Sequence, residues 1–274
     1  MKQKKYTKHF IFLSVLLIIL FYLNISLGSV SIPIKDIFNS IFGGNVAKDS
    51  WQTIIINFRI PKAITATLVG SGLSVCGLLM QTLFRNPLAG PFVLGISSGA
   101  SLGVAILILG SSVFGGFLLT HSPSQWSLPI AASLGAFLVL SAVIIAANKV
   151  RNTMSILIIG LMFGSLTSAV ISVLAYFSYA EQIKQYLFWS FGSLGNLTWY
   201  EIAVFSIIYA IGIIGTVYVI KPLNSLLLGE NYAKSLGINV KQSRNIILLI
   251  TSLLTGVITA FSGPIAFIGL AVPH

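Results

Sequence analysis

Charged residues are scarce in this chain, and acidic ones are the scarcest. Only 8% of the 274 residues are charged, 56% are hydrophobic and the mean hydropathy is +0.97. Soluble domains carry about 25% charged residues, so an ordinary soluble domain is excluded. Five acidic against 16 basic residues give a net charge of +11. The basic residues are spread over short connections without a recognised nucleic-acid motif, so we assign the charge to a membrane surface and expect no nucleic-acid partner.

The chain also lacks the usual signs of catalysis. Its one cysteine, Cys76, excludes an intrachain disulfide. It has no Gly-x-x-x-x-Gly-Lys-Ser/Thr phosphate loop and no Gly-Lys pair, so it cannot bind ATP by that route. None of the three histidines is visibly paired with a serine or carboxylate in an apolar run. We therefore predict no catalytic residue, no metal site and no cofactor bound by this chain.

Long apolar runs dominate the sequence instead. Each is about 18 to 24 residues long, the length that a membrane-spanning helix needs. The seven runs lie at residues 10–28, 63–80, 92–110, 127–147, 155–178, 202–220 and 245–262. An eighth apolar segment begins at Gly263 and stops at His274. The sequence predicts an all-α integral membrane protein, a polytopic helical bundle forming a single transmembrane domain over residues 1–274.

The basic residues predict the orientation of this bundle. With the N-terminus in the cytoplasm, eleven basic residues lie inside and five outside, as the positive-inside rule requires. The inside set is Lys2, Lys4, Lys5, Lys8, Arg85, Lys149, Arg151, Lys221, Lys234, Lys241 and Arg244. We therefore expect a multi-pass membrane protein, in contact with membrane lipid and with its N-terminus in the cytoplasm.

A rigid turn separates the second and third runs. Pro87 and Pro91 lack the amide proton that a continuing helix needs, and Asn86 precedes a proline, which favours an extended or turn conformation. Arg85 would be costly in the hydrocarbon core, so the turn lies at or beyond a membrane surface. We interpret Arg85, Asn86 and Pro87 as a cytoplasmic turn near an inner gate, or as a stiff connector between two helices.

Small and polar side chains mark the helices that follow. Gly95, Gly99 and Gly103 recur at i, i+4 and i+8, which places them on one helical stripe where another backbone can approach. We interpret this stripe as helix packing. A second set of side chains could line a translocation path or could make ordinary interhelical contacts. This set is Met80, Ser97, Ser98, Ser168 and Ser172.

The runs contain no Asp, Glu, Lys or Arg, the residues that ion-coupled carriers use as relays in the membrane. The energy for any transport therefore comes from elsewhere, and if ATP is used a separate subunit must bind it. The longest inside connection, residues 221–244, contains short helical pieces interrupted at Gly229 and Gly237. It is too short and polar to span a membrane, and it suits either docking on a partner protein or lying on lipid.

An ordered set of motifs from residue 59 to the end of the chain resembles the FecCD-type permeases, membrane subunits of bacterial ABC importers for iron-siderophores, haem and cobalamin. The motifs are Arg59-Ile60-Pro61-Lys62; Gln81 with Arg85-Asn86-Pro87-Leu88-Ala89-Gly90-Pro91; Leu94-Gly95 with Gly99-Ala100; Trp189 with Gly192-Ser193-Leu194; Leu228-Gly229-Glu230 with Ala233 and Leu236-Gly237; and Ser262-Gly263-Pro264-Ile265-Ala266-Phe267-Ile268-Gly269-Leu270 with Pro273-His274.

The resemblance implies a ten-helix permease of the large-substrate (type II) architecture in the bacterial cytoplasmic (inner) membrane. It would pair with a second permease copy, as a homodimer, with two ATP-binding subunits that hold ATP and Mg, and with an extracytoplasmic substrate-binding protein. Transport would proceed by alternating access. Arg59 and Lys62 would grip acidic side chains of the binding protein, although the family usually has arginine at both places. The ATPase-coupling residues would be Leu226, Leu227, Leu228, Gly229, Glu230, Ala233, Leu236 and Gly237.

The family pattern continues beyond Pro273-His274, where this chain stops. We therefore expect about eight of ten transmembrane helices, in a fragment or a natural truncation. Two other function classes stay open from the sequence. One is an ion-coupled secondary transporter, and the other is a membrane subunit that does not pump.

Overall fold

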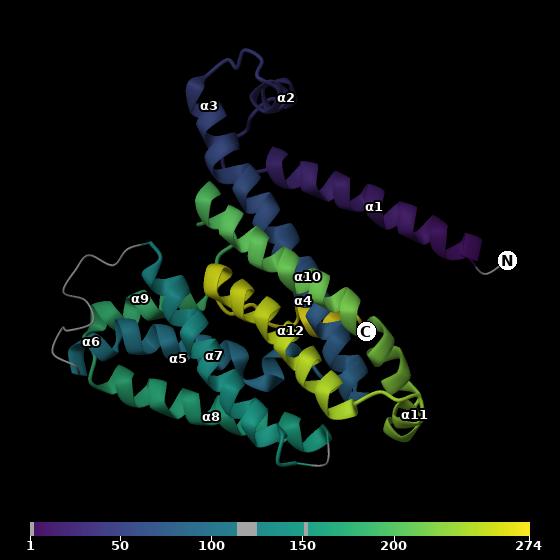
Figure 1. The fold of residues 1–274 in the computed structure, drawn as a ribbon. Helices are drawn as coiled ribbons and strands as arrows, with labels where there is room; N and C mark the ends of the chain where they lie inside the picture. The colour runs from purple at the N-terminus through teal and green to yellow at the C-terminus, as the bar shows by residue number, and fades with distance from the viewer. Residues whose placement is uncertain (1–2, 114–124, 151–152) are drawn as a thin grey trace. The chain divides into compact units, whose positions relative to one another are not determined.

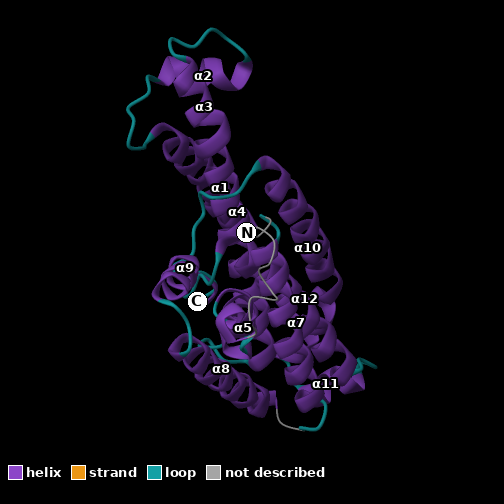
Figure 2. Ribbon diagram, turned by 90° about the vertical axis from the view of Figure 1, so that its left-hand side faces the viewer, coloured by secondary structure: helices purple, strands orange, loops and turns teal. Residues whose placement is uncertain are grey.

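A computed structural model describes residues 3–113, 125–150 and 153–274 of the chain. Within those ranges every regular element is a helix (Figures 1 and 2). Lys2 and Arg151, two of the basic residues used to predict the orientation, lie outside the described residues. The all-α class is confirmed.

Six of the helices are long and apolar enough to cross a membrane, and α3 and α4 belong to one continuous helical span, Asp49–Phe84. The longer helices are α1 (Gln3–Ser26), α4 (Ile60–Phe84), α7 (Ser127–Ala147), α8 (Thr153–Tyr176), α10 (Trp199–Leu227) and α12 (Val240–Ser262). The shorter elements are α2 (Ile34–Phe42), α3 (Asp49–Ile54), the π-helical turn η1 (Ile55–Arg59), the 3-10 turn η2 (Pro91–Leu94), α5 (Ile96–Ile108), α6 (Gly110–Val113), α9 (Ala180–Ser190), α11 (Glu230–Ser235) and α13 (Ile268–Ala271).

Two apolar stretches are built differently from the prediction. The run at 92–110 forms η2 and then α5, a helix of only 13 residues, because Gly95 takes a left-handed φ of 73° between them. The stretch after Ser262 does not continue as a long helix. Gly263 ends α12 with a φ of 75°, and the next helix, α13, has four residues.

Apolar side chains on the long helices face outward. Only 6% of the apolar window of α1, and 22% of the windows of α8 and α10, is buried inside the chain. Leu, Ile and Phe side chains are therefore exposed along these helices, for example Ile18 at 68% and Ile214 at 71%. Surfaces of this extent are unfavourable in water, so lipid or partner subunits cover them.

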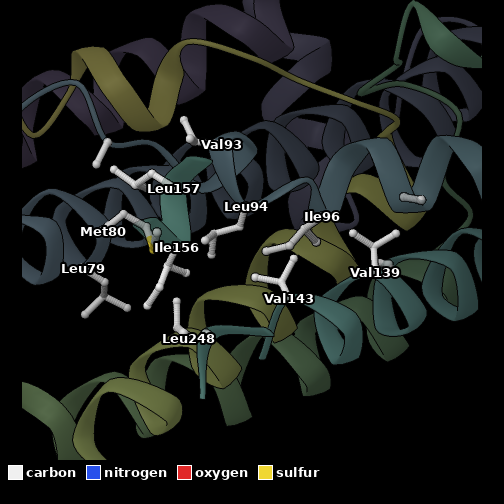
Figure 3. Close-up of a cluster of buried hydrophobic side chains, with 14 of the residues drawn as sticks. Leu79, Met80, Val93, Leu94, Ile96, Val139, Val143, Ile156, Leu157 and Leu248 are labelled. Atoms are coloured by element: carbon white, nitrogen blue, oxygen red, sulfur yellow. The ribbon is translucent and has the colours of Figure 1, made fainter. Parts of the chain in front are cut away.

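The contacts group the chain into two compact units, and the single transmembrane domain stays a prediction. One unit comprises Met1–Thr67 with Leu194–Ile202, and the other comprises Leu68–Ser193 with Ala203–His274. Two of the boundaries fall within α4 and α10, and the third falls in the connection between α9 and α10. The second unit holds the larger core, whose buried side chains come from α4, η2, α5, α7, α8, α10, α11 and α12. Figure 3 shows part of this core.

Glycines let α5 and α7 pack at backbone distance inside the second unit. A Cβ on Gly99 would lie 2.7 Å from the Gly135 carbonyl oxygen, and one on Gly103 would lie 2.0 Å from that of Ala131. Both distances are shorter than real side-chain contacts. Gly95 lies against α8, where its Cβ would be 3.0 Å from the Gly160 oxygen. The three glycines of the predicted stripe therefore occupy positions of close helix packing.

Candidate coupling and docking site

The Arg85 turn is a tightly hydrogen-bonded structure at the end of α4. Arg85 itself has a left-handed φ of 47°. The Asn86 side-chain oxygen accepts a hydrogen bond from the Leu88 amide at 2.9 Å, and the Ala89 amide donates to the Asn86 carbonyl at 3.0 Å. Pro87 lies between these groups, and its missing amide proton leaves no donor unsatisfied. The turn is therefore rigid, as its sequence predicts.

Arg85 reaches from this turn to the end of α10. Its Nε donates to the Leu226 carbonyl oxygen at 3.0 Å, and its Nη2 donates to the same oxygen. The last carbonyls of a helix lack amide partners within the helix, and a cation there also complements the helix dipole. The turn between α4 and η2 is thus bonded to the start of the predicted coupling segment.

The predicted coupling residues divide by exposure. Leu226 and Ala233 are buried, and Ala233 packs in the core of the second unit. The exposed apolar side chains are Leu227, Leu228, Tyr232 and Leu236. Gly229 joins α10 to α11 with a φ of 127°, and Gly237 ends α11 with a φ of 78°, so both breaks occur at glycines in conformations that other residues rarely adopt. Glu230 opens α11.

A third connection lies at the same end of the second unit. Arg244 Nη2 donates to the carbonyl oxygen of Ala147, the last residue of α7, at 3.5 Å. Next to it, Asn245 Nδ2 donates to Asn148 Oδ1 at 3.2 Å. The end of α7 and the start of α12 are thus bonded to each other, and Lys149 and Arg244, two basic residues that the sequence places inside, lie there.

Arg59, predicted to dock the binding protein, is buried inside the first unit. Its Nη1 donates to the carbonyl oxygens of Ile25 and Ser26 at 2.8 Å each, and its Nη2 donates to that of Val30. Its side chain is only 7% exposed. In this structure the guanidinium caps the end of α1 and is not displayed to a partner, while Lys62, one turn later, is exposed. Docking by this pair stays a prediction.

The residues proposed for a translocation path lie in different surroundings. Met80 is fully buried in the core shown in Figure 3. In this structure it therefore makes interhelical contacts, one of the two alternatives that the sequence leaves open. Ser97 is half-buried, with its Oγ 3.4 Å from Thr259 Oγ1. Ser168 and Ser172 are exposed on α8, and each hydroxyl donates to a carbonyl one turn earlier. Ser98 is half-buried beside Gly164.

Four buried charged residues lie outside the apolar runs but inside helical segments of the described chain. Asp36 lies in α2, where its Oδ1 accepts a hydrogen bond from the Ala47 amide at 3.1 Å. Arg59 and Arg244 cap helix ends, as described above. Glu201 forms a capping box at the start of α10, where its Oε2 accepts from the Thr198 amide at 2.8 Å and from the Thr198 hydroxyl at 2.7 Å. None of these four buried charged side chains is bonded to another of them. Within the described residues they therefore do not form the chain of paired charges that gradient-driven carriers use as an ion relay.

Sequence reasoning assigned no role to two side chains that hold segments together. Gln81 Nε2 donates to the carbonyl oxygen of Leu270 in α13 at 3.0 Å, and Trp199 Nε1 donates to that of Ile56 in η1 at 3.1 Å. Pro61 explains the second bond, because the π-helical pattern of η1 would pair the Ile56 oxygen with residue 61, and proline has no amide proton. The available signal was Pro61, just before the apolar run at residues 63–80.

These features define a class of protein. The chain is a polytopic helical membrane subunit, with a polar segment outside its spans that is bonded to the Arg85 turn. The part of the chain that the structure describes contains no chain of paired charges inside the helices. Comparison with known proteins gives the family. The sequence model that describes the FecCD transport family matches residues 16–274 of this chain. The chain belongs to this family.

Named relatives agree with the assignment. The chain is 36% identical over 266 residues to the hemin transport system permease protein HmuU of Yersinia pestis, covering 96% of this chain and 76% of that one. It is 32% identical over 275 residues to the vitamin B12 import system permease protein BtuC of Vibrio parahaemolyticus, covering 100% of this chain and 77% of that one. A solved structure described as an inward-facing metal-chelate type ABC transporter matches with a TM-score of 0.81 at 27% identity, covering 97% of this chain and 79% of that chain. The chain is thus a permease subunit of an ATP-driven importer.

Proposed function

We propose that this permease carries a large metal chelate, an iron-siderophore, haem or cobalamin, across the cytoplasmic membrane by alternating access. Relatives named for haem and for vitamin B12 support this substrate class. ATP and Mg bind a separate subunit, because this chain has no phosphate loop. Two such subunits, a second copy of the permease and an extracytoplasmic binding protein complete the importer.

The observation that carries this proposal is the exposed apolar surface of the segment from Leu227 to Leu236. Leu228 is 68% exposed and Leu236 is 56% exposed, although both belong to a segment outside the apolar spans. An apolar surface on a short, polar connection suits insertion into a groove of a partner protein. We assign that partner as the ATP-binding subunit, whose closure would move this segment and rock the permease pair.

The orientation of the second unit in the membrane is proposed from the connections at one of its ends. The Arg85 turn, the end of α7 and the coupling segment are connected there by hydrogen bonds. The basic residues of these connections all belong to the set that the positive-inside rule assigns to the cytoplasm. We therefore assign this end of the second unit to the cytoplasm. For the N-terminus we propose the same side from its own basic residues, which the positive-inside rule also assigns to the cytoplasm.

Uptake by proteoliposomes tests the proposal. The permease is reconstituted with its ATP-binding subunit and binding protein, and labelled chelate inside the vesicles is counted with ATP, without ATP, and with an ion gradient alone. We expect accumulation only when ATP and the ATP-binding subunit are both present. Accumulation driven by the gradient without the ATP-binding subunit would instead identify a secondary transporter. Passive equilibration in every condition would identify a subunit that does not pump.

A further inference from the structure

The helix α4 ends in a hydrogen-bond pattern that usually requires glycine. The Arg85 amide donates to the Thr82 carbonyl oxygen at 3.4 Å, and the Asn86 amide donates to that of Gln81 at 3.1 Å. This pair of bonds is the Schellman motif, and Arg85 occupies its left-handed position with a φ of 47°.

The same motif occurs at the end of α11 with a glycine in that position. The Gly237 amide donates to Lys234 at 2.9 Å and the Ile238 amide donates to Ala233 at 3.0 Å, with a φ of 78° at Gly237. A residue with a Cβ adopts this left-handed conformation less readily than glycine does. Backbone strain of this kind persists only where the surrounding structure holds it, and it occurs often at functional sites.

The side chain of Arg85 explains why arginine stands where glycine would be favoured. Its two donors converge on the Leu226 oxygen, which also accepts from the Gly229 amide at 3.1 Å. A Cβ on Gly229 would lie 3.7 Å from Arg85 Nη2, so the guanidinium lies beside the flexible joint between α10 and α11. Charge-assisted bonds from a planar fork are strong and directional. A glycine at position 85 would adopt the left-handed conformation that ends α4 without strain. It would have no side chain to bond the Leu226 oxygen at the joint between α10 and α11.

The last turns of α4 also hold the C-terminal segment. Gln81 Nε2 donates to the Leu270 oxygen at 3.0 Å, and a Cβ on Gly77 would lie 1.6 Å from the Gly269 oxygen, so the two backbones touch. One short stretch of α4 therefore contacts the joint of the coupling segment at Arg85 and the α13 segment at Gln81 and Gly77.

We propose that Arg85 is a positioning residue that transmits movement of the coupling segment to α4 and, through Gln81, to α13. This inference rests on the proposed function, in which the ATP-binding subunit moves residues 226–237. Arg85 fixes the Leu226–Gly229 joint against the end of α4, so a displacement of α11 displaces α4 as well. Without the guanidinium the joint bends and the displacement is lost.

The test uses the importer reconstituted in proteoliposomes and three variants of the permease. Arg85→Gly removes the link but suits the left-handed backbone, so the subunit still folds. Arg85→Lys keeps the charge and loses the planar fork. Lys149→Ala is the matched control, because it removes one exposed positive charge at the same end of the second unit. For each variant we measure thermal stability, retention of the ATP-binding subunit, ATP hydrolysis and chelate imported per ATP.

We expect Arg85→Gly to fold, to retain the ATP-binding subunit and to hydrolyse ATP, while chelate imported per ATP falls about tenfold, the size of a typical coupling between sites. For Arg85→Lys we expect a value of chelate imported per ATP between that of Arg85→Gly and that of the wild type. For Lys149→Ala we expect the wild-type value. Normal import per ATP by Arg85→Gly overturns the inference and leaves the proposed function intact. Loss of folding or of the ATP-binding subunit in Arg85→Gly, or an equal loss of import in Lys149→Ala, also overturns it. A wild-type importer that shows no ATP-driven uptake removes both the proposed function and this inference.

Discussion

Arg59 and Arg85 each donate hydrogen bonds from the guanidinium to carbonyl oxygens at the end of a helix, one in each unit of the molecule. Their backbone conformations differ. Arg59 lies within the helical span Asp49–Phe84 and caps the end of α1, whereas Arg85 follows that span and caps α10. Arg59 is 7% exposed and its backbone is helical. Arg85 is exposed, and it takes a left-handed conformation. Arg59 is buried on a helical backbone, so its hydrogen bonds stabilise the fold. Arg85 holds a strained backbone conformation that permits one side-chain contact, and strain of this kind indicates a role in function.

The largest expected effect is at Arg59. Arg59→Ala removes the partner of three carbonyl oxygens, which buries unsatisfied acceptors and lowers the free energy of unfolding by about 3 kcal/mol. Unfolding of the purified subunit in detergent measures this change. Lys35→Ala, which removes an exposed cation of the same unit, is the control and should leave the stability unchanged. An equal loss in both variants would show that charge, and not the helix cap, is responsible.

A second prediction uses two glycines of α4. A Cβ on Gly77 would overlap the Gly269 backbone, whereas one on Gly70 would meet nothing within 4 Å. Gly77→Ala should therefore lower the stability by about 2 kcal/mol through overpacking, and Gly70→Ala should raise it slightly because alanine favours helix. The same unfolding measurement compares the two. Tolerance of Gly77→Ala would contradict the close contact between α4 and α13.

A smaller effect is expected at Trp199 in the first unit. Trp199→Phe keeps an aromatic ring but removes the donor to the Ile56 oxygen, which Pro61 cannot supply, and the expected loss of stability is about 1 kcal/mol. Trp199→His keeps a ring N–H and should recover part of this loss. If Trp199→Phe leaves the stability unchanged, the carbonyl finds another donor and the bond does not support η1.

The smallest expected change in stability is for Arg85→Gly, and comparing it with Gly237→Ala distinguishes the roles of the two Schellman motifs. Gly237→Ala puts a Cβ into the left-handed position of α11 and should cost about 1 kcal/mol, whereas Arg85→Gly should change the stability by less than that, since the relieved strain offsets the lost bonds. Denaturation of the two variants under one condition measures both. A large loss for Arg85→Gly would make Arg85 a structural cap like Arg59.

Local patterns in the sequence predicted much of this structure, and contacts distant in sequence explain the rest. The helix break at Pro87 and the stripe Gly95, Gly99 and Gly103 depend on neighbouring residues and on helical spacing, so both are readable from sequence. The partner of Arg85 is 141 residues away and that of Arg59 is 34 residues away. Such pairings depend on how helices pack, and a motif cannot show whether a guanidinium faces a partner or the end of a neighbouring helix.

The orientation and the coupling role are tested most directly by cross-linking the assembled importer. A cysteine is placed at Asn231, which is exposed in α11, or at Lys184, which is exposed in α9. The natural Cys76 is buried and stays unreactive. We predict that position 231 cross-links to the ATP-binding subunit and that position 184 does not. Cross-linking of the ATP-binding subunit to position 184, with none at position 231, would contradict the account.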